Sequence, residues 1–148
     1  MNKQHQVILS LGSNQGNRLE NIERCIAFIH KKIGTVIRVS KLYETPSWGF
    51  DSEPFYNAAV VVHTYKDANL ILNEILQLEL DLGRVRSSSD GYQPRIIDID
   101  LISFDEQIIA TEKLKVPHPE MQNRLFVLKP MNDLNLDWRH PDLKSTRL

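Results

Sequence analysis

Two helical stripes, each flanked by strand-forming segments, constrain the fold of this 148-residue chain more than any other feature of its sequence. One stripe follows a capping residue at Asn17 and stops near Gly34, and the other follows Asp67 and stops at Gly83. The β-branched and apolar segments around them lie at 6–11, 35–43, 55–64 and 94–101. This β-α-β-β-α-β order predicts an α+β, ferredoxin-like sandwich with a mostly antiparallel sheet. Both helices should cover one face, and long loops, where sites commonly form, should cover the other.

Composition narrows the class of protein and the kind of partner. With 41% apolar and 25% charged residues, the chain suits a single domain over residues 1–148. A net charge of −1 argues against bulk capture of nucleic acid or of an anionic membrane, so a small partner is expected. The single cysteine, Cys25, cannot form an internal disulfide, and no signal peptide or membrane-spanning run is found. We therefore expect a cytoplasmic protein, and a monomer.

The most unusual strand carries two carboxylates. In the run 94–101, Asp98 and Asp100 lie two residues apart, so both should point to one face of the sheet while Ile97 and Ile99 point to the other. Two neighbouring carboxylates repel each other, and a divalent cation would compensate their charge. The pair therefore predicts a magnesium site.

Four arginines bracket this acidic pair along the chain, at Arg84, Arg86, Arg95 and Arg124. Guanidinium groups bind phosphate oxygens in a bidentate manner and stay charged, so carboxylates and arginines together favour a nucleotide bound with Mg²⁺. Any single arginine could instead be solvated, or could pair with an aspartate. As a set, they favour the phosphate interpretation.

Common nucleotide-binding motifs do not fit this chain. The glycine-containing loop at 12–18 lacks the Gly-Lys-Ser/Thr ending of a P-loop, and no protein-kinase signature occurs. A Rossmann site is also excluded, because no three-glycine turn follows the first strand. A nucleotide site here must be of another type.

Six short blocks, in this order, resemble the 6-hydroxymethyl-7,8-dihydropterin pyrophosphokinase family of folate biosynthesis. They are Gly-Ser-Asn at 12–14, Tyr-Glu-Thr-Pro at 43–46, Phe-Tyr-Asn-Ala-Ala-Val at 55–60, Glu79 with Gly-Arg-Val-Arg at 83–86, Pro-Arg-Ile-Ile-Asp-Ile-Asp at 94–100, and Val-Pro-His-Pro at 116–119 with Asn-Arg-Leu-Phe-Val-Leu at 123–128. The resemblance spans nearly the whole chain. It implies a ferredoxin-like fold, two Mg²⁺ ions, and transfer of the terminal diphosphate of ATP to the pterin hydroxymethyl group with release of AMP.

The resemblance also implies roles for individual residues. The metal ligands would be Asp98 and Asp100. The catalytic group would be these two aspartates with Arg84, Arg86 and Arg95. ATP would be bound by Glu79, Arg86, Arg95, Leu101, His118 and Arg124. The pterin would be bound by Thr45, Pro46, Trp48, Phe55, Asn57 and Phe126, with two aromatic rings stacking on the heterocycle and Asn57 hydrogen-bonding its polar edge.

Other interpretations of the same residues stay open at this point. Without the family, Glu79 could be a solvated helix residue, Phe55 and Phe126 could be core residues, and His118 could belong to a turn. The main alternative function is another Mg²⁺-dependent nucleotide transferase. A ferredoxin-like RNA-binding module fits less well, because it would carry aromatic and basic side chains where this chain has aspartates.

Overall fold

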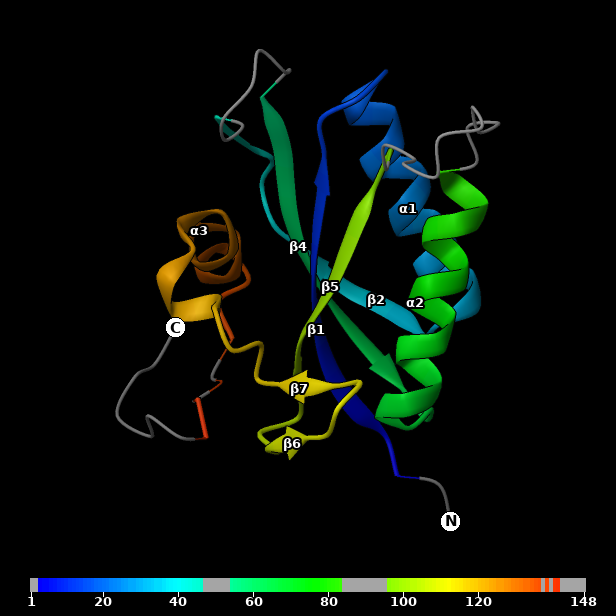
Figure 1. Cartoon of the computed structure of the whole chain (residues 1–148), viewed down its shortest axis with the longest axis vertical. Helices are drawn as coiled ribbons and strands as arrows, with labels where there is room; N and C mark the ends of the chain where they lie inside the picture. The colour runs from blue at the N-terminus through cyan, green and yellow to red at the C-terminus, as the bar shows by residue number, and fades with distance from the viewer. Residues whose placement is uncertain (1–2, 47–53, 84–95, 137, 139, 142–148) are drawn as a thin grey trace.

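A central antiparallel sheet between two layers of helices forms the body of the molecule (Figure 1). The computed structural model describes residues 3–46, 54–83, 96–136, 138, 140 and 141. The strands of this sheet are β1 (His5–Ser13), β2 (Thr35–Val39), β3 (Tyr43–Thr45), β4 (Phe55–Thr64) and β5 (Asp98–Phe104). They lie in the order β2-β4-β1-β5, with β3 also paired to β4, and every pairing is antiparallel. The predicted ferredoxin-like fold is confirmed.

Helices α1 (Arg18–Lys32) and α2 (Ala68–Leu82) pack on one face of the sheet, as predicted (Figure 1). Both begin at the expected caps: Asn17 Oδ1 accepts from the Glu20 N–H at 3.0 Å, and Asp67 Oδ1 accepts from the Leu70 N–H at 2.8 Å. Their apolar stripes bury side chains against alternate residues of β1, β4 and β5, and this layer forms the larger core.

The opposite face is covered mainly by a helix that the sequence pattern did not predict. Helix α3 (Leu125–Asp133) follows a short 3-10 helix (Met121–Asn123) and a small hairpin, β6 (Ile109–Ala110) with β7 (Lys115–Val116). A second core joins α3 to the sheet and includes Trp138, which is 2% exposed. The indole N–H of Trp138 donates to the Asp105 carbonyl at 2.8 Å. The face expected to carry loops is therefore covered, within the described residues, by a packed helical layer.

The segment expected as one strand at 35–43 is divided between β2 and β3. The β2–β4 register shifts between Val36 and Arg38, and the ladder is interrupted at Ser40. The Ser40 hydroxyl accepts from the Ala59 N–H at 2.8 Å and so replaces a backbone acceptor at the interruption. Because of this division, β3 lies beside the end of β4 where Asn57 is found.

No helix in the described part of the chain is long and apolar enough to cross a membrane.

Cys25 offers a direct probe of the helical core, because it is the single cysteine and is fully buried. Burial, with a smaller effect of the Glu79 carboxylate, raises the pKa of its thiol to about 12. We predict that iodoacetamide at pH 8 does not label the native protein, and that labelling follows the urea unfolding curve measured by fluorescence. Rapid labelling in native buffer would contradict this packing.

Trp138 should contribute strongly to the second core. Replacing it with alanine removes a fully buried aromatic side chain, so Trp138→Ala should lower the free energy of unfolding by about 3–5 kcal/mol in urea denaturation. Tyr65→Ala is the matched control, since Tyr65 is 61% exposed and should cost far less. Equal losses in the two variants would show that Trp138 does not hold this layer.

Candidate functional site

Three strands bring polar residues into one row on the face that α3 covers. Gly12 in β1 is opposite Asn57 in β4 on one side and opposite Asp98 in β5 on the other. Two residues earlier in β1, Ser10 is opposite Asp100. Directly opposed residues in antiparallel strands point to the same face. Asn57 and Asp98 are therefore separated by a single glycine across the sheet.

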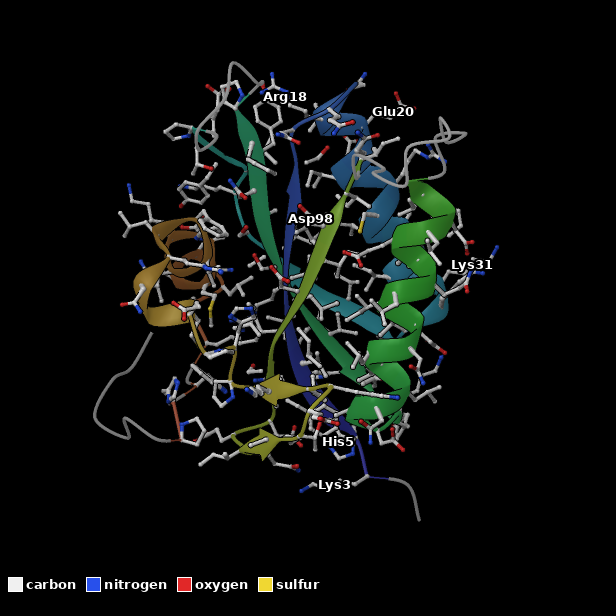
Figure 2. All side chains as sticks on the ribbon, viewed as in Figure 1. Lys3, His5, Arg18, Glu20, Lys31 and Asp98 are labelled. Atoms are coloured by element: carbon white, nitrogen blue, oxygen red, sulfur yellow. The ribbon has the colours of Figure 1, made fainter. Side chains whose placement is uncertain are left out.

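The two aspartates lie on one face of β5, as predicted. Ile97, Ile99 and Leu101 are buried in the core with α1 and α2, whereas Asp98 and Asp100 are half-buried. In Figure 2, Asp98 is labelled in the middle of the view, below Arg18 and above His5. Among the described residues, no group of three or more His, Cys, Asp or Glu side chains could hold a metal ion. The donor set of two carboxylates suits Mg²⁺, which takes one or two carboxylates and completes its coordination with water and substrate phosphates.

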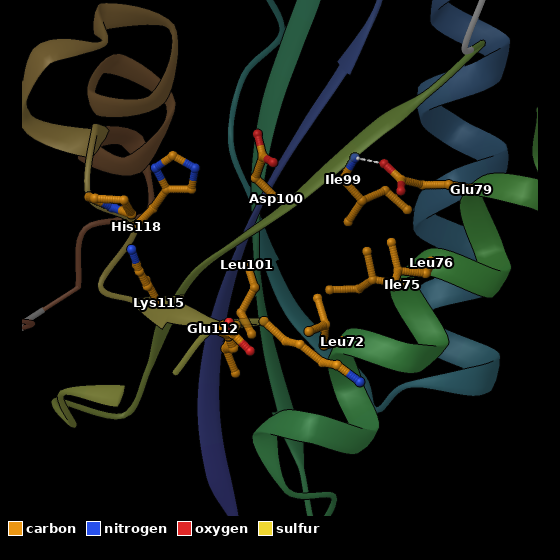
Figure 3. Close-up of a pocket in the computed structure, with 13 residues that line it drawn as sticks. Leu72, Ile75, Leu76, Glu79, Ile99, Asp100, Leu101, Glu112, Lys115 and His118 are labelled. Carbon is orange, nitrogen blue, oxygen red and sulfur yellow. Dashed lines mark hydrogen bonds between the residues drawn. The ribbon is translucent and has the colours of Figure 1, made fainter. Parts of the chain in front are cut away.

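A cavity of about 400 Å³ lies beside β5, between α2 on one side and the β6–β7 hairpin with the segment that follows it on the other (Figure 3). It brings together four residues predicted to bind ATP or metal: Glu79, Asp100, Leu101 and His118. The other residues that line it are Leu72, Ile75, Leu76, Ile99, Glu112, Lys113, Leu114, Lys115 and Pro119. The cavity is thus apolar along α2 and charged along the hairpin and β5.

Glu79 holds α2 to the exposed edge of β5. Its Oε2 accepts a hydrogen bond from the Ile99 N–H at 2.9 Å (Figure 3). This contact satisfies a backbone donor on an edge strand and keeps the carboxylate at the cavity wall. Glu79 is therefore not simply a solvated helix residue.

His118 enters the cavity from the segment after β7. Its backbone N–H donates to the Ile102 carbonyl at 2.8 Å, and its Nδ1 accepts from the Glu120 N–H at 3.2 Å. Partial burial lowers the pKa of the imidazole, with a smaller opposing effect from Asp100. The ring is therefore neutral at pH 7, and with Nδ1 as acceptor its Nε2 carries the proton. In Figure 3 the ring lies on the same side of β5 as Asp100.

The residues predicted to bind pterin gather at the β3–β4 end of the same face. Asn57 is buried, and its side-chain N–H donates to Thr45 Oγ1 at 2.7 Å. Thr45 is opposite Phe55 across the ladder, and the exposed Pro46 follows it. These contacts hold the Asn57 amide beside Phe55, where it can meet the edge of a flat ligand.

Gly12, which has no side chain, leaves room on β1 for the side chains of Asn57 and Phe55. A Cβ atom added at Gly12 would lie 3.2 Å from Asn57 Oδ1 and 3.6 Å from the Phe55 ring. Glycine therefore permits the close approach of the two side chains to β1.

Phe126 and Arg124 come from the start of α3. Phe126 packs against the second core, and the Arg124 guanidinium lies 5.6 Å from the centre of its ring. Arg124 is also close enough to His118 to affect its pKa. Arg124 is thus beside both the predicted aromatic wall and the cavity.

Four residues of the predicted site lie outside the described residues. They are Trp48, Arg84, Arg86 and Arg95. Sequence reasoning missed Glu112, Lys113 and Lys115, which line the cavity from the hairpin. The hairpin strands have two residues each, so no periodic pattern could reveal them.

Comparison with known proteins identifies relatives over the whole site. The sequence model of the 7,8-dihydro-6-hydroxymethylpterin-pyrophosphokinase (HPPK) family matches residues 8–136. A 2-amino-4-hydroxy-6-hydroxymethyldihydropteridine pyrophosphokinase of Porphyromonas gingivalis is 35% identical over 96% of this chain and 98% of its own length. The folic acid synthesis protein of Pneumocystis carinii is 40% identical over 91% of this chain, and this chain spans 18% of that protein.

Solved structures agree on the fold. The wild-type HPPK-DHPS of Plasmodium falciparum superposes with a TM-score of 0.72, at 20% identity, over 94% of this chain and 39% of that protein. The match of the family sequence model over most of the chain, together with a relative aligned along nearly its full length, shows that this chain belongs to the 7,8-dihydro-6-hydroxymethylpterin-pyrophosphokinase family.

Proposed function

We propose that this chain transfers the terminal diphosphate of ATP to the hydroxymethyl group of 6-hydroxymethyl-7,8-dihydropterin, in folate biosynthesis. The hydroxymethyl oxygen would release its proton to solvent and form a bond to the β-phosphorus of ATP, and the bond between that phosphorus and the α–β bridging oxygen would break. AMP leaves with the bridging oxygen. The chain would act as one domain and as a cytoplasmic monomer.

The observation that carries this proposal is the adjacency of the two candidate subsites. The cavity over β5 contains Asp100 and His118, and Asp98 shares a cross-strand row with Asn57. Asn57 and Asp98 lie two strands apart, so the distance between their backbones is about 10 Å. A flat bicyclic ring held at Asn57 would place its hydroxymethyl group toward the aspartates. Donor and acceptor would meet there.

The donor set at Asp98 and Asp100 fits two Mg²⁺ ions bound together with ATP. When bound, such ions neutralise phosphate charge and favour an in-line displacement. The carboxylates would hold them at the edge of the ATP cavity. Neutral His118 would donate its Nε2–H to a phosphate oxygen without adding a charge of its own.

The remaining residues would position the substrates. Glu79 and Leu101 would bind the nucleoside part of ATP, against the apolar wall of α2. Arg84, Arg86, Arg95 and Arg124 would bind phosphate oxygens. On the pterin side, Phe55, Phe126 and Trp48 would contact the ring, with Asn57, Thr45 and Pro46 at its edge.

An RNA-binding role is disfavoured by the second helical layer. RNA-recognition domains stack bases on an open sheet face. Here α3 and Trp138 pack on the corresponding face, with a core that includes Ile8, Ala59 and Val61.

The decisive assay supplies ATP, Mg²⁺ and 6-hydroxymethyl-7,8-dihydropterin to the purified chain. We predict stoichiometric formation of AMP and the pterin diphosphate, and loss of both products on addition of EDTA. Formation of ADP would reject diphosphate transfer in favour of a simple kinase. Absence of any reaction with this acceptor, with activity on another one, would support the alternative nucleotide transferase.

Asp98→Asn and Asp100→Asn keep side-chain shape and remove the charge that a cation needs. If metal binding contributes several kcal/mol to transition-state stabilisation, each variant should lower kcat on the order of 10³-fold while unfolding at the wild-type temperature. Glu106→Gln is the matched control, because Glu106 is an exposed acid just beyond β5 and should leave kcat unchanged. A variant of either aspartate with near-normal kcat would remove that residue from the metal site.

A further inference from the structure

The two walls of the proposed pterin site come from distant parts of the chain. Thr45 and Asn57 belong to β3 and β4, whereas Phe126 belongs to α3. We propose that the hydrogen bond between Tyr43 and Asp133 sets the spacing of these walls, so that both are positioning residues for the pterin. This inference rests on the function proposed above.

Tyr43 lies next to the pterin wall of the sheet. It is directly opposite Asn57 in the β3–β4 ladder and two residues before Thr45. Residues in these positions share one face of the sheet. Tyr43 therefore extends the cross-strand row of Asn57, Gly12 and Asp98 by one further strand, toward α3.

Asp133 is related to Phe126 by the geometry of the helix. It is the last residue of α3 and lies seven positions after Phe126, which is close to two helical turns. The two side chains are therefore on the same side of α3. A contact at Asp133 fixes the rotation of the helix about its axis as well as its distance from the sheet.

The contact itself joins residues 90 positions apart. The Tyr43 hydroxyl donates to Asp133 Oδ2 at 2.6 Å, and the Lys41 N–H donates to the same oxygen at 3.2 Å. A phenol bound to a carboxylate at this distance forms a short, charge-assisted hydrogen bond. The same bond raises the pKa of the Tyr43 phenol, so the phenol stays protonated and remains a donor.

A second contact anchors the same end of α3 independently. The Nη1 atom of Arg38 donates both to the Leu134 carbonyl, at 2.7 Å, and to the Asn135 carbonyl, at 2.9 Å. These carbonyls lie just past the helix end, where a cation is favourable. The buried Val127, Pro130 and Met131 hold the middle of the helix. Loss of the Tyr43 hydroxyl should therefore shift α3 without detaching it.

Loss of this contact should affect ATP binding less than pterin binding, because Arg124 alone flanks α3 among the described residues proposed to bind ATP. The cavity over β5 is lined by residues of α2, β5 and the segment from Glu112 to Pro119, and neither Tyr43 nor Asp133 is among them. A positioning role thus predicts a selective defect in pterin use. A role in stability alone would change the unfolding temperature and leave both KM values unchanged.

The test compares Tyr43→Phe, Asp133→Ala, the double variant and wild type by steady-state kinetics with each substrate varied. A net loss of one charge-assisted hydrogen bond should raise KM for the pterin about tenfold. KM for ATP should rise much less, because only Arg124 links α3 to the nucleotide among the described residues. Because the two residues act through one contact, the double variant should be no worse than the poorer single variant. Asp133→Asn keeps an acceptor oxygen and should restore part of the loss.

Tyr65→Phe is the matched control, since Tyr65 is a mostly exposed tyrosine between β4 and α2. Equal increases in both KM values, or additive effects in the double variant, would overturn the proposal. An effect of Tyr43→Phe without one of Asp133→Ala would make Tyr43 a direct pterin contact, and would also overturn it. Failure of the wild-type protein to make AMP with the pterin would instead reject the proposed function itself.

Discussion

The register of β1 between β4 and β5 is the constraint on which the rest of the structure depends. It aligns Asn57, Gly12 and Asp98 in one row, so a candidate pterin contact and a candidate metal ligand are two strands apart. A shift of one residue would turn every side chain of β1 to the other face. The apolar residues of β1 that face α1 and α2 would then be lost from the core, and this cost protects the alignment of the site.

One face of the sheet serves as both core and site. Toward one end it is apolar, where Ile8, Ala59 and Val61 lie under α3 and Trp138. Toward the other end the same strands carry small and polar residues, among them Ser10 and Gly12. The small side chains leave room for a ligand, while the apolar half holds α3 in place beside it. The residues that stabilise the fold and the residues that could bind a ligand thus occupy different ends of the same strands, not separate layers of the molecule.

Sequence patterns between neighbouring residues predicted helices α1 and α2 well. The helical stripes and their caps at Asn17 and Asp67 follow from backbone geometry, and each is present where expected. Helix α3 escaped prediction because it has nine residues and contains Pro130, which lacks the N–H that an interior helical residue donates. Packing of its buried face on the sheet compensates for that weak local signal, and packing is not visible in a short sequence window.

By itself the sequence determined that Asp98 and Asp100 share a face, because side chains alternate along any strand. It also determined where α1 and α2 begin, through side chains that bond to nearby backbone groups. Only the tertiary structure decided that Asn57 lies across one glycine from Asp98, and that Tyr43 reaches Asp133 from 90 positions away. Such contacts depend on strand register and helix docking, which are set by burial over the whole chain and not by neighbours in sequence.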